Sequence, residues 1–392
     1  MKQNGKIPVL VASMCINLFV GAIYAWSVFA GPLGDKFGWS GTAVALTFTI
    51  ANGISPVTMI TGGKLLDKFG PRWVVFIGGI LFGGGMIASG FIESLSGIYV
   101  TYGLFVGFGM GMVYSCTISN TVKFFPEKKG LVAGLATGSY GMSTVILAPI
   151  AQRLIDGMGV MAAFRILGAA SVLVICVGSQ FLRKAPQQDQ ADHGEGMAWK
   201  EMLGTGRFYV LLIMLVFGAT AGLMMIGQAS QMARTLVGLS AAKAALCVSV
   251  LALANAGGRV IWGMISDGFG YFKSLFIMFF ILTVAMGALF LQGNGNLGVF
   301  MGAILLIGSC FGGLMGVFPA ITAGQFGIKH NGTNYGIMFC GFAIGGFLGP
   351  YLAAALRETE LGLYSMAFLA AGALSLTGCV LAFILRNSLD RA

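Results

Sequence analysis

Charge is scarce in this chain. Asp, Glu, Lys and Arg together make up only 9% of the residues, whereas 57% are hydrophobic, and the mean hydropathy is +0.88. This balance lies far outside that of water-soluble globular proteins and excludes that class. The sequence therefore predicts an all-α integral membrane protein.

Clustered metal ligands and thiol pairs are also lacking. The seven cysteines stand singly inside apolar segments, without the close spacing of metal sites or redox pairs. His193 has Asp192 and Glu195 nearby, but a polar linker explains that cluster better than a metal site. No cofactor is expected, and the net charge of +10 is interpreted as a topology signal, with no support for nucleic-acid binding.

Long apolar runs dominate what is present. A membrane-spanning helix needs about 20 mostly apolar residues, because every backbone polar group must be satisfied within the segment. Twelve such segments can be marked, at residues 7–30, 42–63, 73–91, 97–122, 131–154, 160–182, 208–232, 241–265, 274–292, 297–322, 334–356 and 361–385.

The 62 glycines are expected to let these helices approach closely. The clearest stripes are Gly103, Gly107 and Gly111, and Gly341, Gly345 and Gly349.

The basic residues are distributed unevenly over the predicted loops. Sixteen of the 23 Lys and Arg fall on the side that holds both termini, six fall on the other side, and Arg259 lies within a span. The positive-inside rule therefore predicts a multi-pass protein of the plasma (inner) membrane with both termini cytoplasmic.

The two halves of the sequence resemble each other. "GKLLDKFGPR" (63–72) and "GMISDGFGYFK" (263–273) align at an offset of 200, so that Asp67 matches Asp267. Two related six-helix halves are expected. The predicted divisions are an N-terminal bundle (1–182), a cytoplasmic linker (183–207) and a C-terminal bundle (208–392).

The motif G-x-x-x-D-K-x-G-x-R and its echo resemble those of the major facilitator superfamily. Within it, "GAIYAWSVF" (21–29), "SNTVKFFPEKKGLVAGLATGSYG" (119–141) and "NYGIMFCGFAIGGFLGP" (334–350) resemble the oxalate/formate antiporter family and its monocarboxylate-transporting relatives. The resemblance implies the major facilitator fold, with twelve transmembrane helices in two pseudo-symmetric six-helix bundles.

Arg259 is the one charge placed well inside a predicted span. It lies eight residues before Asp267, which at 1.5 Å per residue puts it about 12 Å into a core about 30 Å thick. An unpaired arginine there costs at least about 2.5 to 3.5 kcal/mol, so such residues usually serve function. A substrate carboxylate could supply the missing charge, since guanidinium binds carboxylates in bidentate fashion. Alternatively, Arg259 extends to the cytoplasm or caps carbonyls of a neighbouring helix.

Asn255 shares the helix face of Arg259, four residues earlier. Some monocarboxylate carriers that the chain resembles have an aspartate at this position, so its absence puts proton coupling through an arginine–carboxylate pair in doubt. The resemblance also places Tyr114 and Tyr140 on the central cavity, and Tyr24 lies in the Y-x-W-S motif. Each tyrosine offers a small pocket an apolar ring and one hydroxyl. Ordinary interhelix packing is the alternative for each tyrosine.

The resemblance fails at one position. Oxalate carriers of the family have a lysine in helix eleven for a second carboxylate, and its place falls at or near Phe342. A single buried cation suits a monoanion, because a dianion would leave one charge unpaired at a cost of several kcal/mol.

Four loop charges are predicted to gate the carrier. Asp67, Lys68 and Arg72, with Asp267, are expected to form a latch that stabilises the conformation closed to the cytoplasm, as the resemblance implies. The alternative is a charged turn that only fixes topology.

The sequence thus predicts a secondary active transporter and not an enzyme. Its expected substrates are small monocarboxylates of the lactate, pyruvate or formate class, carried by alternating access as proton symport or anion exchange. Alternatives are an oxalate/formate-type dicarboxylate antiporter, a drug exporter of the same fold, and a transport-like sensor. The expected partners are the substrate anion, the lipid bilayer and a proton or counter-anion, with the protein acting as a monomer.

Overall fold

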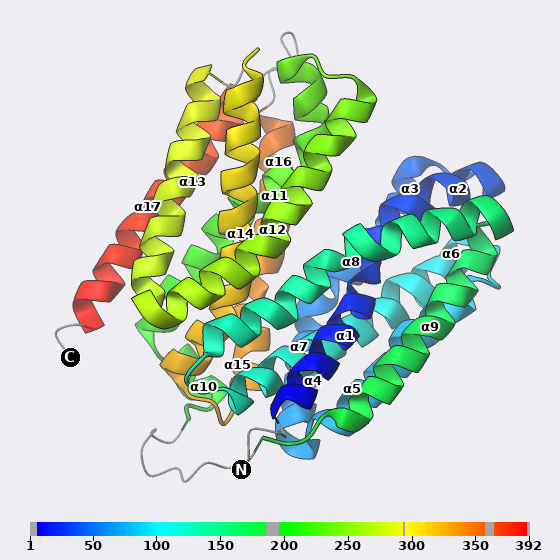
Figure 1. Ribbon diagram of the computed structural model, residues 1–392, viewed down its shortest axis with the longest axis horizontal. Coiled ribbons are helices and arrows are strands. Elements are labelled where there is room, and N and C mark those ends of the chain that lie inside the picture. The colour runs from blue at the N-terminus through cyan, green and yellow to red at the C-terminus, as the bar shows by residue number, and fades with distance from the viewer. Residues whose placement is uncertain (1–5, 186–195, 293–294, 357–363, 390–392) are drawn as a thin grey trace. The chain divides into compact units, whose positions relative to one another are not determined.

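Helices account for the whole architecture of the described chain. The computed structural model describes residues 6–185, 196–292, 295–356 and 364–389. Within these ranges twelve helices are long and apolar enough to cross a membrane, and no strand occurs (Figure 1). The prediction of an all-α membrane protein with twelve spans is confirmed. His193 and its acidic neighbours lie outside the described residues.

The helices of the first half begin with α1 and end with α9. They are α1 (Lys6–Val20), η2 (Gly21–Ala25), α2 (Trp26–Phe37), α3 (Gly41–Gly53), α4 (Ser55–Phe69), α5 (Pro71–Ser89), α6 (Leu95–Ile98), η3 (Tyr99–Val106), α7 (Gly107–Phe124), α8 (Lys129–Met158) and α9 (Val160–Phe181). After the linker follow α10 (Trp199–Leu203), α11 (Gly206–Val237), α12 (Ala241–Phe269), α13 (Tyr271–Gln292), α14 (Leu297–Phe326), α15 (Asn331–Met338), α16 (Cys340–Ala355) and α17 (Ser365–Leu389).

Equivalent helices pack in equivalent ways in the two halves. In the first half α5 and α1 both pack on α9; in the second half α13 and α11 both pack on α17. Figure 1 shows α5 beside α9 and α13 beside α17. The packing supports the internal duplication expected from the sequence.

The chain divides into two compact units. One contains residues 1–126, 139–200 and 322–337, and the other contains 127–138, 201–321 and 338–392. Each unit is thus built mainly from one half of the sequence and includes one short helical segment from the other half. The predicted boundaries at residues 182 and 208 stay a prediction.

The ends of two equivalent helices provide a second sign of the duplication, in addition to the repeated loop motif. Gly38 and Gly238 both end a helix with φ of 68°, a conformation that glycine adopts without steric cost. Two residues later Ser40 and Ser240 each cap the next helix through a side-chain oxygen. The offset is again 200. The first predicted span, 7–30, ends too early, because the helix continues to Phe37 before this glycine stops it.

Several spans are not regular α-helices. The first contains the 3₁₀ segment η2, the fourth contains the π-helical segment η3, and the eleventh breaks at Phe339 between α15 and α16. At η2 the backbone of Gly21 touches the Tyr140 carbonyl of α8. Irregular turns of this kind are frequent at functional sites.

Both glycine stripes lie at close helix contacts, as predicted. A Cβ at Gly107 would lie 2.8 Å from the Ala51 Cα, and one at Gly349 would lie 2.6 Å from the Thr220 carbonyl and 2.7 Å from the Met224 amide nitrogen. The glycines therefore set the distance between neighbouring helix backbones.

We expect Gly349→Ala to destabilise the protein by about 1 to 3 kcal/mol, the range for added methyl groups in a packed interior. Gly287→Ala is the matched control, because a Cβ there meets no atom within 4 Å. Thermal unfolding in detergent measures both variants, and equal melting temperatures would contradict the role of Gly349.

Candidate functional site

Arg259 lies buried in α12, with only 4% of its surface exposed. Its Nε donates to Asn255 Oδ1 at 3.1 Å and its Nη1 donates to the Thr137 carbonyl of α8 at 2.9 Å. Within the described ranges no carboxylate lies at ion-pairing distance from the guanidinium. The guanidinium is thus hydrogen-bonded, but no described carboxylate compensates its charge.

Asn255 turns its amide oxygen toward Arg259 and leaves its amide nitrogen unengaged. The side chain is 6% exposed, and Nδ2 is buried without a hydrogen-bond partner among the described residues. A buried donor in this state costs about 1 to 3 kcal/mol. Together with Nη2 of Arg259, it offers hydrogen bonds to an anionic acceptor.

Glycines bring three helices together around Arg259. A Cβ at Gly134 of α8 or at Gly316 of α14 would overlap the Arg259 carbonyl, and one at Gly312 would overlap that of Asn255. The Thr137 carbonyl reaches the guanidinium because α8 and α12 approach this closely. One of the two acceptors of Arg259 is thus a backbone atom, which the residue type at position 137 does not reveal.

Phe342 lies in an aromatic stack of the same unit. Its ring stacks on Phe339 with centroids 4.6 Å apart and on Phe311 at 6.4 Å. Phe311 is adjacent to Gly312, which touches the Asn255 backbone. The position that the family resemblance assigns to a second cation therefore carries an apolar ring.

The three predicted tyrosines form one cluster in the other unit. Tyr140 lies at its centre, with ring centroids 5.1 Å from Tyr24 and 4.9 Å from Tyr114. Tyr114 and Tyr140 are 5% and 6% exposed, and the Tyr140 hydroxyl donates to the Met110 sulfur at 3.3 Å. Tyr24 is half-buried in η2. The structure brings these residues together, and their role in binding stays a prediction.

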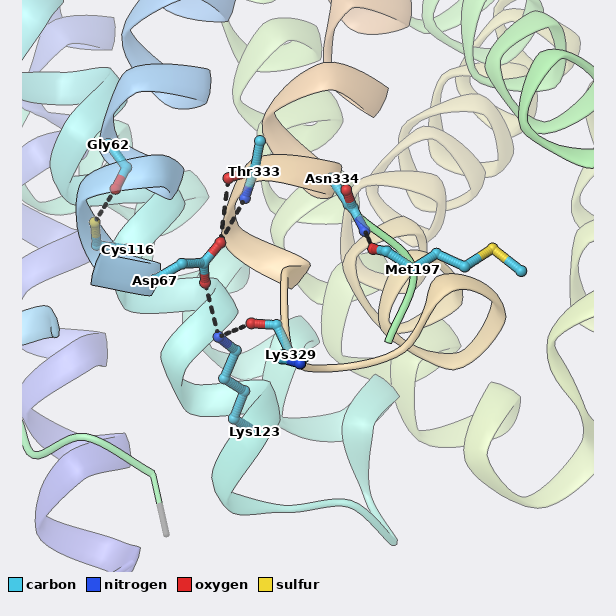
Figure 2. Close-up of polar contacts among 8 residues, drawn as sticks. All are labelled: Gly62, Asp67, Cys116, Lys123, Met197, Lys329, Thr333 and Asn334. Atoms are coloured by element: carbon cyan, nitrogen blue, oxygen red, sulfur yellow. Dashed lines mark hydrogen bonds and ion pairs between the residues drawn. The ribbon is translucent and has the colours of Figure 1, made fainter. Parts of the chain in front are cut away.

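Asp67 connects α4 to two other helices. Its Oδ1 accepts from Lys123 of α7 at 3.0 Å, and its Oδ2 accepts from the Thr333 hydroxyl of α15 at 3.1 Å and the Thr333 amide at 3.4 Å. Lys123 also donates to the Lys329 carbonyl at 3.3 Å. Figure 2 shows the Asp67 carboxylate between Lys123 and Thr333.

Asp267 makes the corresponding contact at the start of α8. Its two carboxylate oxygens accept from the amides of Gly130 and Leu131, both at 2.7 Å. A carboxylate at a helix N-terminus binds free amides and the positive end of the helix dipole. Each of the two matched aspartates thus binds the first turn of a helix from the opposite half of the sequence.

Lys68 and Arg72 make different contacts from the aspartates. Both side chains are exposed, with the Lys68 ammonium 5.1 Å from the Phe69 ring and the Arg72 guanidinium 5.5 Å from the Trp73 ring. Their predicted part in gating stays a prediction.

The bond from Arg259 to Thr137 is the carbonyl capping expected from the sequence as the alternative for this arginine, although the acceptor residue was not identified. The sequence did not predict the Lys123–Asp67 ion pair and the Thr333 bonds. A further contact ties the end of the linker to α15, since Asn334 Nδ2 donates to the Met197 carbonyl at 3.0 Å (Figure 2). Lys123 was visible only as a basic residue at the end of an apolar run. No cluster of metal-binding side chains occurs in the described part of the chain.

Twelve spans in two related halves define a membrane transporter of the major facilitator fold. The sequence model of the Major Facilitator Superfamily matches residues 10–350 and again 237–391. The chain belongs to this superfamily, whose members transport small molecules across membranes and are not enzymes.

Relatives and solved structures agree with this assignment. The chain is 31% identical to an uncharacterized MFS-type transporter, YhjX, of Escherichia coli K12, over 88% of this chain and 86% of the relative. It is 30% identical to the oxalate:formate antiporter of Oxalobacter formigenes, over 92% and 86%, and 26% identical to monocarboxylate transporter 13 of Bos taurus, over 95% and 87%. The proton:xylose symporter XylE shares the fold, with a TM-score of 0.80 at 13% identity, over 98% of this chain and 96% of that one.

We expect Asp67→Asn to loosen the contact between α4 and α15, because a neutral amide accepts the two Thr333 hydrogen bonds less strongly than the carboxylate does. Leu66 is 3% exposed and abuts Gly332 of α15, so a Leu66→Cys probe should react severalfold faster with a water-soluble thiol reagent in the Asp67→Asn background. Asp35→Asn, which removes an exposed carboxylate on α2, is the control and should leave the rate unchanged. An unchanged rate in Asp67→Asn would count against a latch at this contact.

Proposed function

We propose that the protein is a secondary active carrier of small organic monocarboxylates, of the lactate, pyruvate or formate class. The observation that carries this proposal is the buried charge of Arg259 with no described carboxylate beside it. A guanidinium stays charged at any working pH. A substrate carboxylate would complete the site.

The donor set around Arg259 supports an anion of this kind. Nη1 and Nη2 form a planar fork suited to two carboxylate oxygens, and the buried Asn255 Nδ2 adds one more donor. Asn255 is neutral, so it orients the guanidinium through its oxygen and leaves the charge to the substrate.

The apolar stack of Phe342, Phe339 and Phe311 supports a monoanion. A dicarboxylate would place its second charge against aromatic rings or leave it unpaired, at a cost of several kcal/mol. The oxalate:formate antiporter among the relatives keeps a dicarboxylate antiporter as the alternative substrate class.

Transport would proceed by alternating access, with the two related halves rocking about a binding site. Asp67 and Asp267 would hold the cytoplasmic side closed, because each binds the first turn of a helix from the opposite half of the sequence. The basic residues of the loops favour a cytoplasmic position for both termini and the plasma (inner) membrane as location.

Among the ways to drive transport of the substrate anion, exchange for a second anion needs the fewest assumptions. If the carrier turns over only when Arg259 is neutralised, one anion must leave before another returns. Proton symport remains the alternative if the proton travels on the substrate acid. A drug exporter would favour a membrane carboxylate for lipophilic cations, and a sensor would bind its ligand without moving it.

Replacing Arg259 tests the proposal. We expect Arg259→Gln to weaken lactate, pyruvate or formate binding at least about 30-fold, since loss of one partner of a buried charge pair costs about 2 to 5 kcal/mol. Uptake into proteoliposomes should disappear while the melting temperature in detergent changes little. Arg165→Gln, which removes an exposed arginine lying over Phe91, should retain uptake. Retained uptake in Arg259→Gln would falsify the site, and binding without uptake by the native protein would indicate a sensor.

Adding a cation at position 342 tests the substrate class. Phe342→Lys should improve oxalate binding about tenfold relative to lactate, because it supplies a partner for a second carboxylate. Phe342→Leu removes the aromatic ring without adding charge and should leave the oxalate-to-lactate ratio unchanged. Calorimetric titration of both ligands measures the ratio, and equal ratios in the two variants would contradict the single-cation argument.

A further inference from the structure

Asp67 belongs to a close contact between α4 and α15, here named the α4–α15 junction. The carboxylate binds Thr333 at the start of α15. One turn away, a Cβ at Gly63 would overlap the Gly332 backbone. A further turn away, a Cβ at Gly336 would lie 2.9 Å from the Met59 carbonyl carbon.

The α8–α12 junction repeats this arrangement in the other unit. Asp267 binds the amide of Gly130 at the start of α8. A Cβ at Gly130 would overlap the Gly263 carbonyl, and a Cβ at Gly134 would overlap that of Arg259. Residues of α4 and α12 correspond at an offset of 200, and those of α8 and α15 correspond at 202.

One difference between the two junctions is the charged side chain at position 259. Arg259 stands where the offset of 200 places Met59, and both are buried. Only Arg259 adds a charged hydrogen bond across its junction, from Nη1 to the Thr137 carbonyl at 2.9 Å. The α8–α12 junction therefore contains a bond that a substrate carboxylate can replace, because a carboxylate is a stronger acceptor for a guanidinium than a neutral carbonyl.

We propose that the Thr137 carbonyl takes the place of the substrate carboxylate at Arg259 when no substrate is bound. Substrate binding at Arg259 then loosens the α8–α12 junction and leaves the α4–α15 junction unchanged. This inference rests on the proposed function. Because Asn255 occupies Nε, a bidentate carboxylate uses Nη1 and Nη2 and so competes with the Thr137 carbonyl for Nη1. Asp267 lies two turns along the same junction, which connects substrate occupancy to the predicted latch.

Coupling between two sites is reciprocal, so separating α8 from α12 must strengthen substrate binding. Gly134→Ala forces the two backbones apart at Arg259 and should lower the Kd for lactate about tenfold, the lower end of what one hydrogen bond to a charged group contributes. Gly336→Ala is the matched control at the equivalent position of the α4–α15 junction and should leave the Kd within about twofold. Calorimetric titration measures both, and an unchanged or raised Kd in Gly134→Ala overturns the proposal.

Spin-label distances on the otherwise unaltered junctions provide a second measurement. In a background without the seven native cysteines, one sample carries labels at Glu127→Cys and Phe269→Cys, and the control carries them at the equivalent Lys329→Cys and Phe69→Cys. All four side chains are exposed. Saturating lactate should lengthen or broaden only the distance between positions 127 and 269. No change there in a sample that binds lactate, or an equal change at both junctions, overturns the proposal. Absence of lactate binding by the native protein would refute the proposed function instead.

Discussion

A permanent positive charge buried without a described carboxylate beside it is the constraint on which the site depends. Guanidinium cannot shed its charge by losing a proton inside a protein. Hydrogen bonds from Arg259 to Asn255 and to the Thr137 carbonyl satisfy part of its donor capacity, but both acceptors are neutral. The fold can therefore hold the arginine in place without neutralising it. A buried charge without a compensating carboxylate is unfavourable for a residue with only a structural role, whereas it suits a binding site that a substrate anion would complete.

Gly134 follows from the same constraint. A backbone carbonyl of α8 can serve as acceptor for Arg259 only if α8 lies against α12, and this contact requires that Gly134 has no Cβ. The same close approach places Asp267 on the free amides of Gly130 and Leu131. The contacts of Arg259, Asp267 and Gly134 thus lie along one helix pair. Under the proposed function, their proximity would connect substrate occupancy to the predicted latch.

The sequence predicted what depends on local periodicity and on residue type. The twelve spans followed from apolar runs, the shared face of Asn255 and Arg259 from helical spacing, and the matched aspartates from an offset of 200. It offered a carbonyl of a neighbouring helix only as an alternative partner for Arg259, and it did not identify which one. A backbone carbonyl such as that of Thr137 has no signature in residue type, and Lys123 and Thr333 meet Asp67 across 56 and 266 residues of chain. The Ser40 and Ser240 caps do have a signature, because each serine stands directly before an apolar run and two residues after a glycine.

Duplication gives the protein two halves with similar backbones. A carrier of a monoanion needs side chains of different charge at equivalent positions of these halves. Two equivalent buried cations would require two negative charges, whereas one cation requires one. At the positions related by the offset, Met59 and Arg259 are both buried, but only Arg259 is charged. Phe342 adds an apolar ring where a second cation would suit a dicarboxylate. Under the proposed function, the single charge limits the anion that can complete the site, and the α8–α12 contact is the one whose strength that anion would change.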